Sequence, residues 1–463
     1  MKKVLPVLLL LLSPAVLPAQ SPEGSRPKAL VFTHVTVVDA TGAPAQPDMT
    51  VVITGDRITE IGKSGKVSVP TDAQVLDATD QYLIPGLWDM HVHTTFSLFL
   101  SLYVANGVTG VRDMGNRPEF INKLRKEVAD GTLLGPRIIA AGPIVDGPRP
   151  IWPNISIPVA NASQARKAVD DLKSRGQDFI KVYSGLSREA YFAIADEAKR
   201  QGIPFAGHVP GSVSVVEASN AGQKSIEHLN GVALACSARE DYLRRETVML
   251  GRSKLILETY SQHKAAALFA LLAKNETWQV PTLTVARAIS SLNDKNFTND
   301  PRLKYVPAVL RERWDLKKDF RFQNRTEDDW TIQRRGYRRA IEIVGAMHRA
   351  GVPIMAGTDT TNPYVFPGFS LHDELALLVQ AGLTPMQALQ TATVNPARFL
   401  GMEKELGTVQ QGKLADLILL AANPLENINN TKKINAVVVM GRLLDRKELD
   451  GLLAQAEATA GKK

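Results

Sequence analysis

The sequence contains very little cysteine. Cys236 is the one cysteine among 463 residues, so no intrachain disulfide can form and a cysteine-rich zinc site is excluded. A strong charge of one sign is also missing, because 55 lysines and arginines face 47 aspartates and glutamates, for a formal net charge of +8. This mild excess does not argue for a nucleic-acid partner. At this length the core can be large, and packing alone can hold the fold together.

Long apolar runs are scarce, and the one at the N-terminus has the form of a targeting segment. Lys2 and Lys3 precede an apolar stretch over residues 4–17, which ends before Ala19 and a polar continuation. This order predicts a signal peptide over residues 1–19 and export to the periplasm or the medium. The alternative is a membrane anchor, but the stretch is short for a bilayer and contains prolines. We therefore expect no membrane anchor after signal cleavage.

The secondary-structure pattern that the sequence predicts changes twice along the chain. Short β-rich segments with turn signals fill residues 28–84 and 402–448, which predicts a composite β-sandwich domain built from both ends. Between them, residues 85–401 alternate strands with helices, which predicts an α/β fold, a (β/α)8 TIM barrel. An open doubly wound sheet is the alternative, but no glycine-rich dinucleotide turn follows the first strand. The expected barrel strands are Tyr82–Leu87 continuing to His93, Val108–Arg112, Arg137–Ala141, Phe179–Tyr183, Ile203–His208, Ser225–Leu229, Gln279–Leu283 and Val352–Asp359.

Metal-ligand residue types collect at the ends of these strands. His91 and His93 lie two apart, so strand alternation points both side chains to one face. His208, His228 and Asp359 end three further strands. The C-terminal strand ends are where such barrels carry their chemistry. Four of the eight histidines fall at these positions, which favours a metal site over ordinary core histidines.

Lys181 lies in the middle of an expected barrel strand, where both faces are buried. A buried ammonium must be paired, neutralised or modified. One interpretation is a lysine paired with a buried carboxylate. The other is a carbamate, formed when a deprotonated lysine captures carbon dioxide and becomes a carboxylate able to bridge two cations.

The ordered set of His91-x-His93, Lys181, His208, His228 and Asp359 resembles the amidohydrolase superfamily in its binuclear form with a carboxylated lysine. The similarity covers about residues 29–442, and the nearest branch is the imidazolonepropionase-like and prolidase-like amidohydrolases. The local motifs that carry it are Pro85-Gly86-Leu87-Trp88-Asp89-Met90-His91-Val92-His93, Gly207-His208-Val209-Pro210, Glu227-His228-Leu229, Gly357-Thr358-Asp359-Thr360 and Gly412-Lys413-Leu414-Ala415-Asp416-Leu417.

The resemblance implies a site for two divalent ions, zinc in the first place and manganese as an alternative. It assigns His91, His93 and Asp359 to the more buried ion, His208 and His228 to the second, and carboxylated Lys181 to both. A hydroxide shared by the two ions would attack the substrate carbonyl. Asp359 would act as general base and then as general acid.

Two further features concern the substrate. Tyr183 shares a strand face with Lys181 and is either a hydrogen-bond donor to a carbonyl or an aromatic cap without a catalytic role. The insertion at about residues 286–349 holds 15 basic and 9 acidic residues and is too long for a simple connection. Our hypothesis is a lid in which Arg334 and Arg335 meet an anionic substrate; the alternative is a solvated helical hairpin or an oligomer contact.

The resemblance implies an exported metal-dependent hydrolase of amide bonds. The substrate would be an N-acyl amino acid or a peptide with a free carboxylate. An Xaa-Pro dipeptidase is an alternative. Dipeptidases of this branch often carry a Gly-Gly-His-Gly motif after the third strand and a His-Ala-Tyr motif at the end of the fifth. Here Ala141–Pro148 lacks the histidine of the first motif and His208-Val209-Pro210 lacks the tyrosine of the second, which weakens this alternative. A hydrolase of cyclic amides or lactones is another, and an inactive barrel used as a binding module is a third. Assembly of the chain into a homo-oligomer is left as an open alternative.

Overall fold

The computed structural model describes residues 29–245 and 249–461. The predicted signal peptide over residues 1–19 lies outside the described residues, so its export role stays a prediction. Within the described part, no helix combines the length and the apolar character that crossing a membrane requires.

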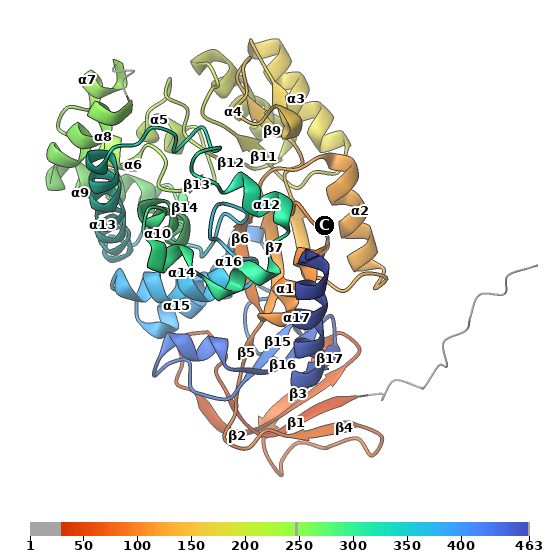
Figure 1. Cartoon of the computed structure of the whole chain (residues 1–463). Coiled ribbons are helices and arrows are strands. Elements are labelled where there is room, and N and C mark those ends of the chain that lie inside the picture. The colour runs from red at the N-terminus through yellow and green to blue at the C-terminus, as the bar shows by residue number, and fades with distance from the viewer. Residues whose placement is uncertain (1–28, 246–248, 462–463) are drawn as a thin grey trace, which may run out of the picture.

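Strands from both ends of the chain share one mixed sheet, which lies at one end of the molecule (Figure 1). Its strands are β1 (Leu30–Val37), β2 (Gln46–Thr54), β3 (Arg57–Lys63), β4 (Gln74–Asp77), β5 (Tyr82–Pro85), β15 (Leu417–Leu420), β16 (Ile434–Val439) and β17 (Arg442–Asp445). The hydrogen-bonded order is β17-β16-β15-β5-β1-β2-β3, with β4 beside β1. The two ends of the chain meet where β15 runs antiparallel to β5.

Side-chain alternation lets this sheet serve two cores. Leu417 and Leu419 of β15 join an apolar cluster within the sheet's own fold. Ile418 and Leu420, on the opposite face, pack into the main core of the molecule. The sheet is therefore fixed to the body by its second face. Its strands lie within or next to the predicted segments 28–84 and 402–448, whose boundaries as a domain stay a prediction.

Parallel strands occupy the body of the molecule, in two sheets. The first contains β6 (Leu87–Val92), β7 (Val108–Asp113) and β8 (Arg137–Ala140). The second has the order β10-β9-β11-β12-β13-β14 and contains β9 (Ile144–Asp146), β10 (Ser156–Pro158), β11 (Ile180–Val182), β12 (Phe205–Gly207), β13 (Ser225–Glu227) and β14 (Trp278–Val280). The α/β prediction is confirmed in this coarser form.

Two strand predictions were wrong in detail. The expected strand Tyr82–His93 is split at Gly86, because its amide donates to Asp416 of the mixed sheet. The expected strand Val352–Asp359 is not a regular strand and makes isolated bridges. Pro353 has no amide to donate, and Asp359 has a left-handed φ of 57°. The segment still lies between β14 and β6: the Met355 amide donates to β14, and the Met90 amide of β6 donates to Ala356.

Helices surround the parallel strands (Figure 1). Those before the insertion are α1 (Leu98–Ala105), α2 (Pro118–Ala129), the 3₁₀ turn η1 (Pro153–Ile155), α3 (Ala162–Ser174), α4 (Arg188–Gln201), α5 (Val215–Asn220), α6 (Val232–Ala235), α7 (Glu240–Arg245), α8 (Met249–Glu258) and α9 (Gln262–Lys274). Those after it are α14 (Phe369–Gln380), α15 (Pro385–Thr391), α16 (Val394–Leu400), η3 (Ile428–Lys432) and α17 (Arg446–Ala460).

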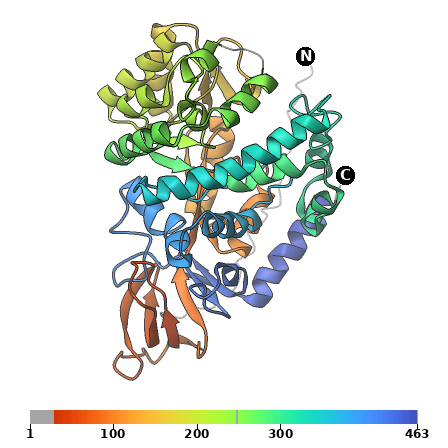
Figure 2. The ribbon, with the colours of Figure 1, turned by 90° about the vertical axis from the view of Figure 1, so that its left-hand side faces the viewer.

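The insertion is helical for much of its length. It contains α10 (Leu283–Ser291), α11 (Lys295–Thr298), η2 (Pro301–Tyr305), α12 (Ala308–Arg313) and α13 (Glu327–Arg349), the long helix that crosses one side of the molecule in Figure 2. Between α12 and α13, residues 315–325 form turns and no helix. Asp315 and Asp319 accept hydrogen bonds from the backbone amides two residues on, which competes with helix formation.

Candidate metal centre

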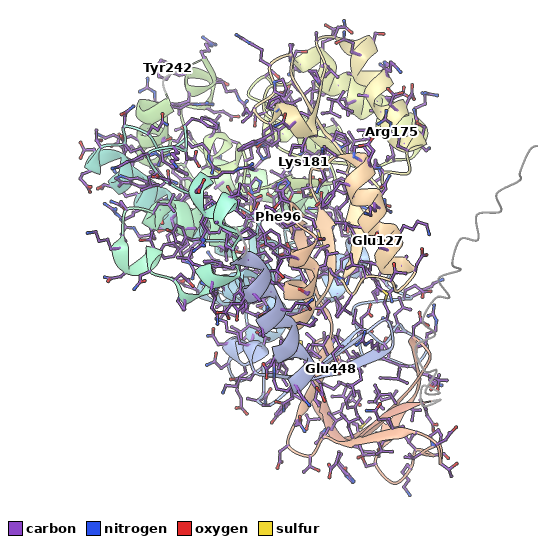
Figure 3. The ribbon with its side chains drawn as sticks, turned by 45° about the vertical axis from the view of Figure 1, so that its right-hand side comes forward. Phe96, Glu127, Arg175, Lys181, Tyr242 and Glu448 are labelled. Carbon is purple, nitrogen blue, oxygen red and sulfur yellow. The ribbon has the colours of Figure 1, made fainter. Side chains whose placement is uncertain are left out.

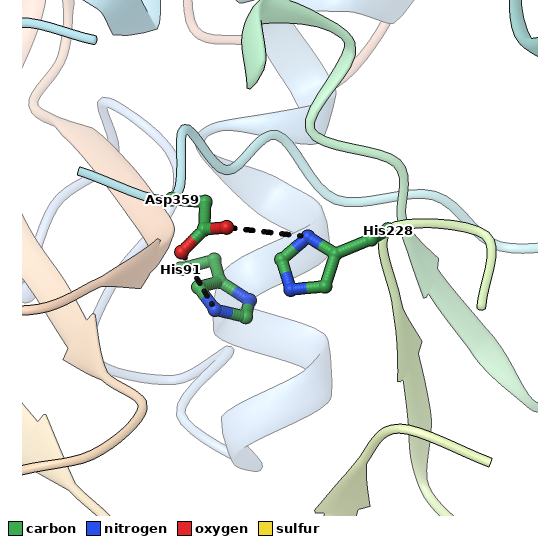
Figure 4. A group of neighbouring side chains, drawn as sticks. All are labelled: His91, His228 and Asp359. Carbon is green, nitrogen blue, oxygen red and sulfur yellow. Dashed lines mark ion pairs between the residues drawn. The ribbon is translucent and has the colours of Figure 1, made fainter. Parts of the chain in front are cut away.

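The metal-ligand types come together at one point. His91 and His228 offer ring nitrogens, and Asp359 a carboxylate oxygen, within 4.8 Å of one another (Figure 4). One Asp359 oxygen lies 3.4 Å from His91 Nε2 and 3.3 Å from His93 Nε2. The other lies 3.6 Å from His228 Nδ1. Residues more than 250 positions apart thus meet where β6, β13 and the irregular segment end.

His208 and Lys181 adjoin this group. The His208 ring lies 5.1 Å from the His228 ring. Lys181 is 1% exposed on β11 and lies among the central strands (Figure 3). Burial, and then the nearby Lys181 ammonium, hold the pKa of His91 and that of His208 well below the ordinary value. Both imidazoles are therefore neutral, the form that binds metal. Burial also lowers the pKa of Lys181 to about 8.

Each imidazole is held through Nδ1 by a group outside the cluster. The partners are Glu227 Oε2 for His91 at 2.7 Å, Gly115 O for His93 at 3.2 Å, Ser184 Oγ for His208 at 2.8 Å and Thr282 Oγ1 for His228 at 2.8 Å. Such partners fix the orientation of metal-binding histidines. With Nδ1 engaged, the Nε2 atoms of His91 and His208 are buried and have no hydrogen-bond partner in the described part of the chain.

The lack of a hydrogen-bond partner at these two nitrogens is a criterion for whether a metal ion fits the site. Buried polar atoms are rarely left without a partner unless an ion or a water supplies it. Here they adjoin a carboxylate and two further imidazoles, a donor set that suits zinc and other divalent ions of its kind. The residues present therefore fit a divalent metal.

Glu227 links the cluster to a buried cation. Its carboxylate accepts from His91 on one side, and from Arg112 Nη2 at 2.9 Å and Ser225 Oγ at 2.5 Å on the other. Arg112 is fully buried and also donates through Nε to the carbonyl of Met90 at 2.7 Å. Sequence reasoning quoted Glu227 in its motif without giving it a role. The signal was its position directly before a strand-end histidine.

Asp89 is a second residue that sequence reasoning left without a role. Its carboxylate accepts from the Thr358 amide at 2.9 Å and hydroxyl at 2.6 Å, directly before Asp359. Burial raises the pKa of Asp89 to about 7. Asp89 alternates with His91 and His93 along one strand, and that periodicity was the available signal. It holds the segment that carries Asp359 in place.

The remaining candidate near the centre is Tyr183. Its ring stacks on His208 at 4.1 Å between centroids, and its hydroxyl oxygen accepts from Trp152 Nε1 at 3.0 Å. Burial raises the pKa of Tyr183 to about 12, so the phenol keeps its proton at neutral pH. Since the indole occupies an acceptor position of the oxygen, that proton is available for another acceptor.

A pocket of about 650 Å³ opens onto His93 and Asp359. The insertion contributes the basic side chains of Arg313, Lys318 and Arg321 to its lining. Arg334 and Arg335, the predicted substrate residues, lie on α13 and do not line this pocket. Arg334 instead contacts Asn293 and Thr331.

Comparisons with known proteins found a matching family model, a curated relative and solved structures of similar fold. The Amidohydrolase family model matches residues 82–444. The ochratoxinase of Aspergillus niger is 23% identical over 419 residues, covering 77% of this chain and 73% of that protein. Among solved structures, a bottromycin amidohydrolase is 25% identical with a TM-score of 0.77, covering 94% of this chain and 92% of its own. A prolidase from Bifidobacterium longum, described as putative, is 26% identical with a TM-score of 0.67, covering 93% and 99%.

Proposed function

The chain belongs to the amidohydrolase family, whose members hydrolyse carbon–nitrogen bonds, and from this premise we propose that it is an exported, metal-dependent hydrolase of amides. The substrate is an N-acyl amino acid or a peptide with a free carboxylate. We propose further that the two parallel sheets and residues 353–360 together form a (β/α)8 barrel beside a composite β-domain, which is supported by the bridges of that segment to β14 at Ile354 and to β6 at Thr360.

The observation that carries the proposal is the set of orphaned ligand atoms. Among the described residues, His91 Nε2 and His208 Nε2 are buried without a hydrogen-bond partner; His91 lies in the group with His228 and Asp359, and the His208 ring lies 5.1 Å from the His228 ring. His91, His93 and Asp359 would hold one divalent ion, with zinc the best fit. His208 and His228 would hold the second, and Lys181, carboxylated, would lie between them. When bound, such ions polarise a carbonyl and make water acidic enough to attack at neutral pH.

The protein's own groups position the substrate and move the proton. Burial alone would raise the pKa of Asp359, but His228 and His93 hold it below its ordinary value, so the carboxylate is ionised and able to accept a proton. Asp359 Oδ is the base that takes the proton of the attacking water and returns it to the leaving amine. Tyr183 donates a hydrogen bond through its phenol O–H, which keeps its proton, to the carbonyl oxygen as negative charge develops there.

The insertion supplies the positive charge that binds the carboxylate of the substrate. Arg321 lines the pocket and keeps N–H groups beyond those bound to Asp319 and Asn362. It is therefore better placed for this role than the Arg334–Arg335 pair. Neutralising Arg334 and Arg335 together should leave KM for carboxylate substrates unchanged, whereas Arg321→Gln should raise it.

An amine-release assay tests the function. Purified mature protein is incubated with N-acyl amino acids and dipeptides, with and without a chelator, and metal content is measured in parallel. We expect release that stops with chelator and returns with added Zn²⁺. No release from a protein that holds two metal ions would favour cyclic amides or lactones. No release and no bound metal would favour the inactive binding module.

A second candidate, an Xaa-Pro dipeptidase, is favoured by the likeness to the B. longum prolidase. Xaa-Pro dipeptides and their N-acyl-glycine counterparts, at equal concentrations, separate the two. A kcat/KM at least tenfold higher for the Xaa-Pro series would establish the dipeptidase.

A further inference from the structure

Exposed apolar side chains gather at the mouth of the catalytic pocket. Phe320 is 66% exposed, the highest value among the exposed large hydrophobic residues of the described chain. Val309, at 49%, lines the same pocket, and Ile151, at 48%, directly precedes Trp152. Exposed apolar residues are informative where they adjoin one another at a ligand-binding groove. They occur here beside the pocket that leads to His93 and Asp359.

Phe320 and Trp152, the residue after Ile151, form an edge-to-face aromatic pair. Trp152 follows β9 and Phe320 belongs to the insertion, yet their ring centroids lie 6.4 Å apart at an angle of 60°. Trp314 adds a third aromatic ring to the pocket lining. Phe320 has little to pack against, since two thirds of it is exposed. Most of its surface is therefore available to a bound group that packs beside Trp152.

We propose that Trp152 and Phe320 form a subsite for an aromatic group of the substrate, so that the enzyme prefers amides with an arylacyl or similarly flat apolar moiety. This inference rests on the proposed function for the bond that is cleaved. A pocket of about 650 Å³ holds an aryl group together with the amide and its carboxylate. The aryl ring packs against Phe320 and the face of Trp152, while Arg321, 6.0 Å from the Trp152 ring, borders the same space.

Trp152 also couples the subsite to the site of reaction. Its indole Nε1 donates to the Tyr183 oxygen at 3.0 Å. An aryl group seated on Trp152 thus lies next to the residue proposed to donate to the carbonyl. The two roles of Trp152 are separable, because Trp152→Phe keeps an aromatic wall and removes the N–H donor, whereas Trp152→Ala removes both.

The test measures binding independently of turnover. The full-length metal-loaded protein is titrated calorimetrically with N-(2-naphthylmethyl)glycine and N-ethylglycine, which have no carbonyl at the amide position and cannot be hydrolysed. We expect the naphthyl probe to bind at least tenfold more tightly. Phe320→Ala should reduce the ratio of the two affinities about tenfold, the size expected for losing one aromatic contact with its buried area. Trp152→Ala should do the same, and Trp152→Phe should preserve the ratio.

Tyr242→Ala is the matched control. Tyr242 is an aromatic residue 47% exposed on α7, away from the central strands (Figure 3), and it does not line the pocket. Its removal should leave the ratio unchanged. Equal affinities for the two probes, or a ratio that Phe320→Ala leaves intact, would overturn the subsite. Failure of the proposed function would instead appear as an absence of amine release while the preference for the naphthyl probe persists.

Discussion

Replacing Glu227 by glutamine tests the link between the buried Arg112 guanidinium and the candidate metal centre. The carboxylate serves His91 on one side and Arg112 with Ser225 on the other. An amide of the same shape satisfies only one side. If its oxygen faces Arg112, its NH₂ faces His91 Nδ1, and the imidazole must then carry its proton on Nε2, the atom proposed to bind metal.

This substitution should change two measurable quantities, the free energy of unfolding and the affinity for metal. Arg112 is fully buried, and loss of its charged partner should reduce the free energy of unfolding by about 3–5 kcal/mol. Loss of an outer partner of a metal-binding histidine should weaken metal affinity about 10- to 100-fold. Urea unfolding of chelator-treated protein measures the first quantity, and competition with a chromophoric chelator measures the second.

Glu197→Gln provides the control. Glu197 is also a buried carboxylate, 3% exposed, but it pairs with Arg200 and Gln201 on α4 and contacts no candidate ligand. It should change metal affinity less than twofold. Wild-type metal affinity in Glu227→Gln would refute the idea that the Nδ1 partner sets the state of His91.

The remaining predictions concern pH, chemistry and sterics. Burial lowers the pKa of His372 to about 4. Between pH 6.5 and pH 4 the unfolded chain binds a proton that the folded chain does not, so the free energy of unfolding should fall by about 3 kcal/mol over this range. His372→Gln should flatten this pH dependence in unfolding curves. Tyr183→Phe should lower kcat of amine release about 100-fold with KM little changed; an unaltered kcat would leave Tyr183 as an aromatic cap. A Cβ at Gly357 would collide with Val280 and the His91 backbone, so Gly357→Ala should cost about 1–3 kcal/mol in thermal unfolding; an unchanged Tm would contradict this packing.

Much of the site followed from the sequence because its residues sit in regular positions. Period-2 alternation puts His91 and His93 on one face, and parallel strands bring their ends to one edge. The recognition of the amidohydrolase family from these motifs is confirmed by the family match. The ligand roles themselves, like the carboxylation of Lys181, stay predictions.

The rest depended on contacts that no local pattern encodes. Ser184 meets His208, and Thr282 meets His228, only through the positions of neighbouring loops. Asp359 sits in an irregular segment because of its left-handed backbone, which an apolar run could not indicate. In the insertion, charge alone suggested Arg334 and Arg335, whereas the turns after α12 determine that Arg321 reaches the pocket.

The shared sheet has a consequence for the order of folding. β5 has its partner β15 more than 300 residues later in the chain. At the usual rate of synthesis, that partner emerges roughly 15–60 s after β5. Until then the β5 edge is unpaired and open to wrong pairing. The N-terminal strands can therefore complete their sheet only after the whole body of parallel strands has been made, and loss of the last fifty residues should leave the nascent chain aggregation-prone even with every candidate metal-ligand residue present.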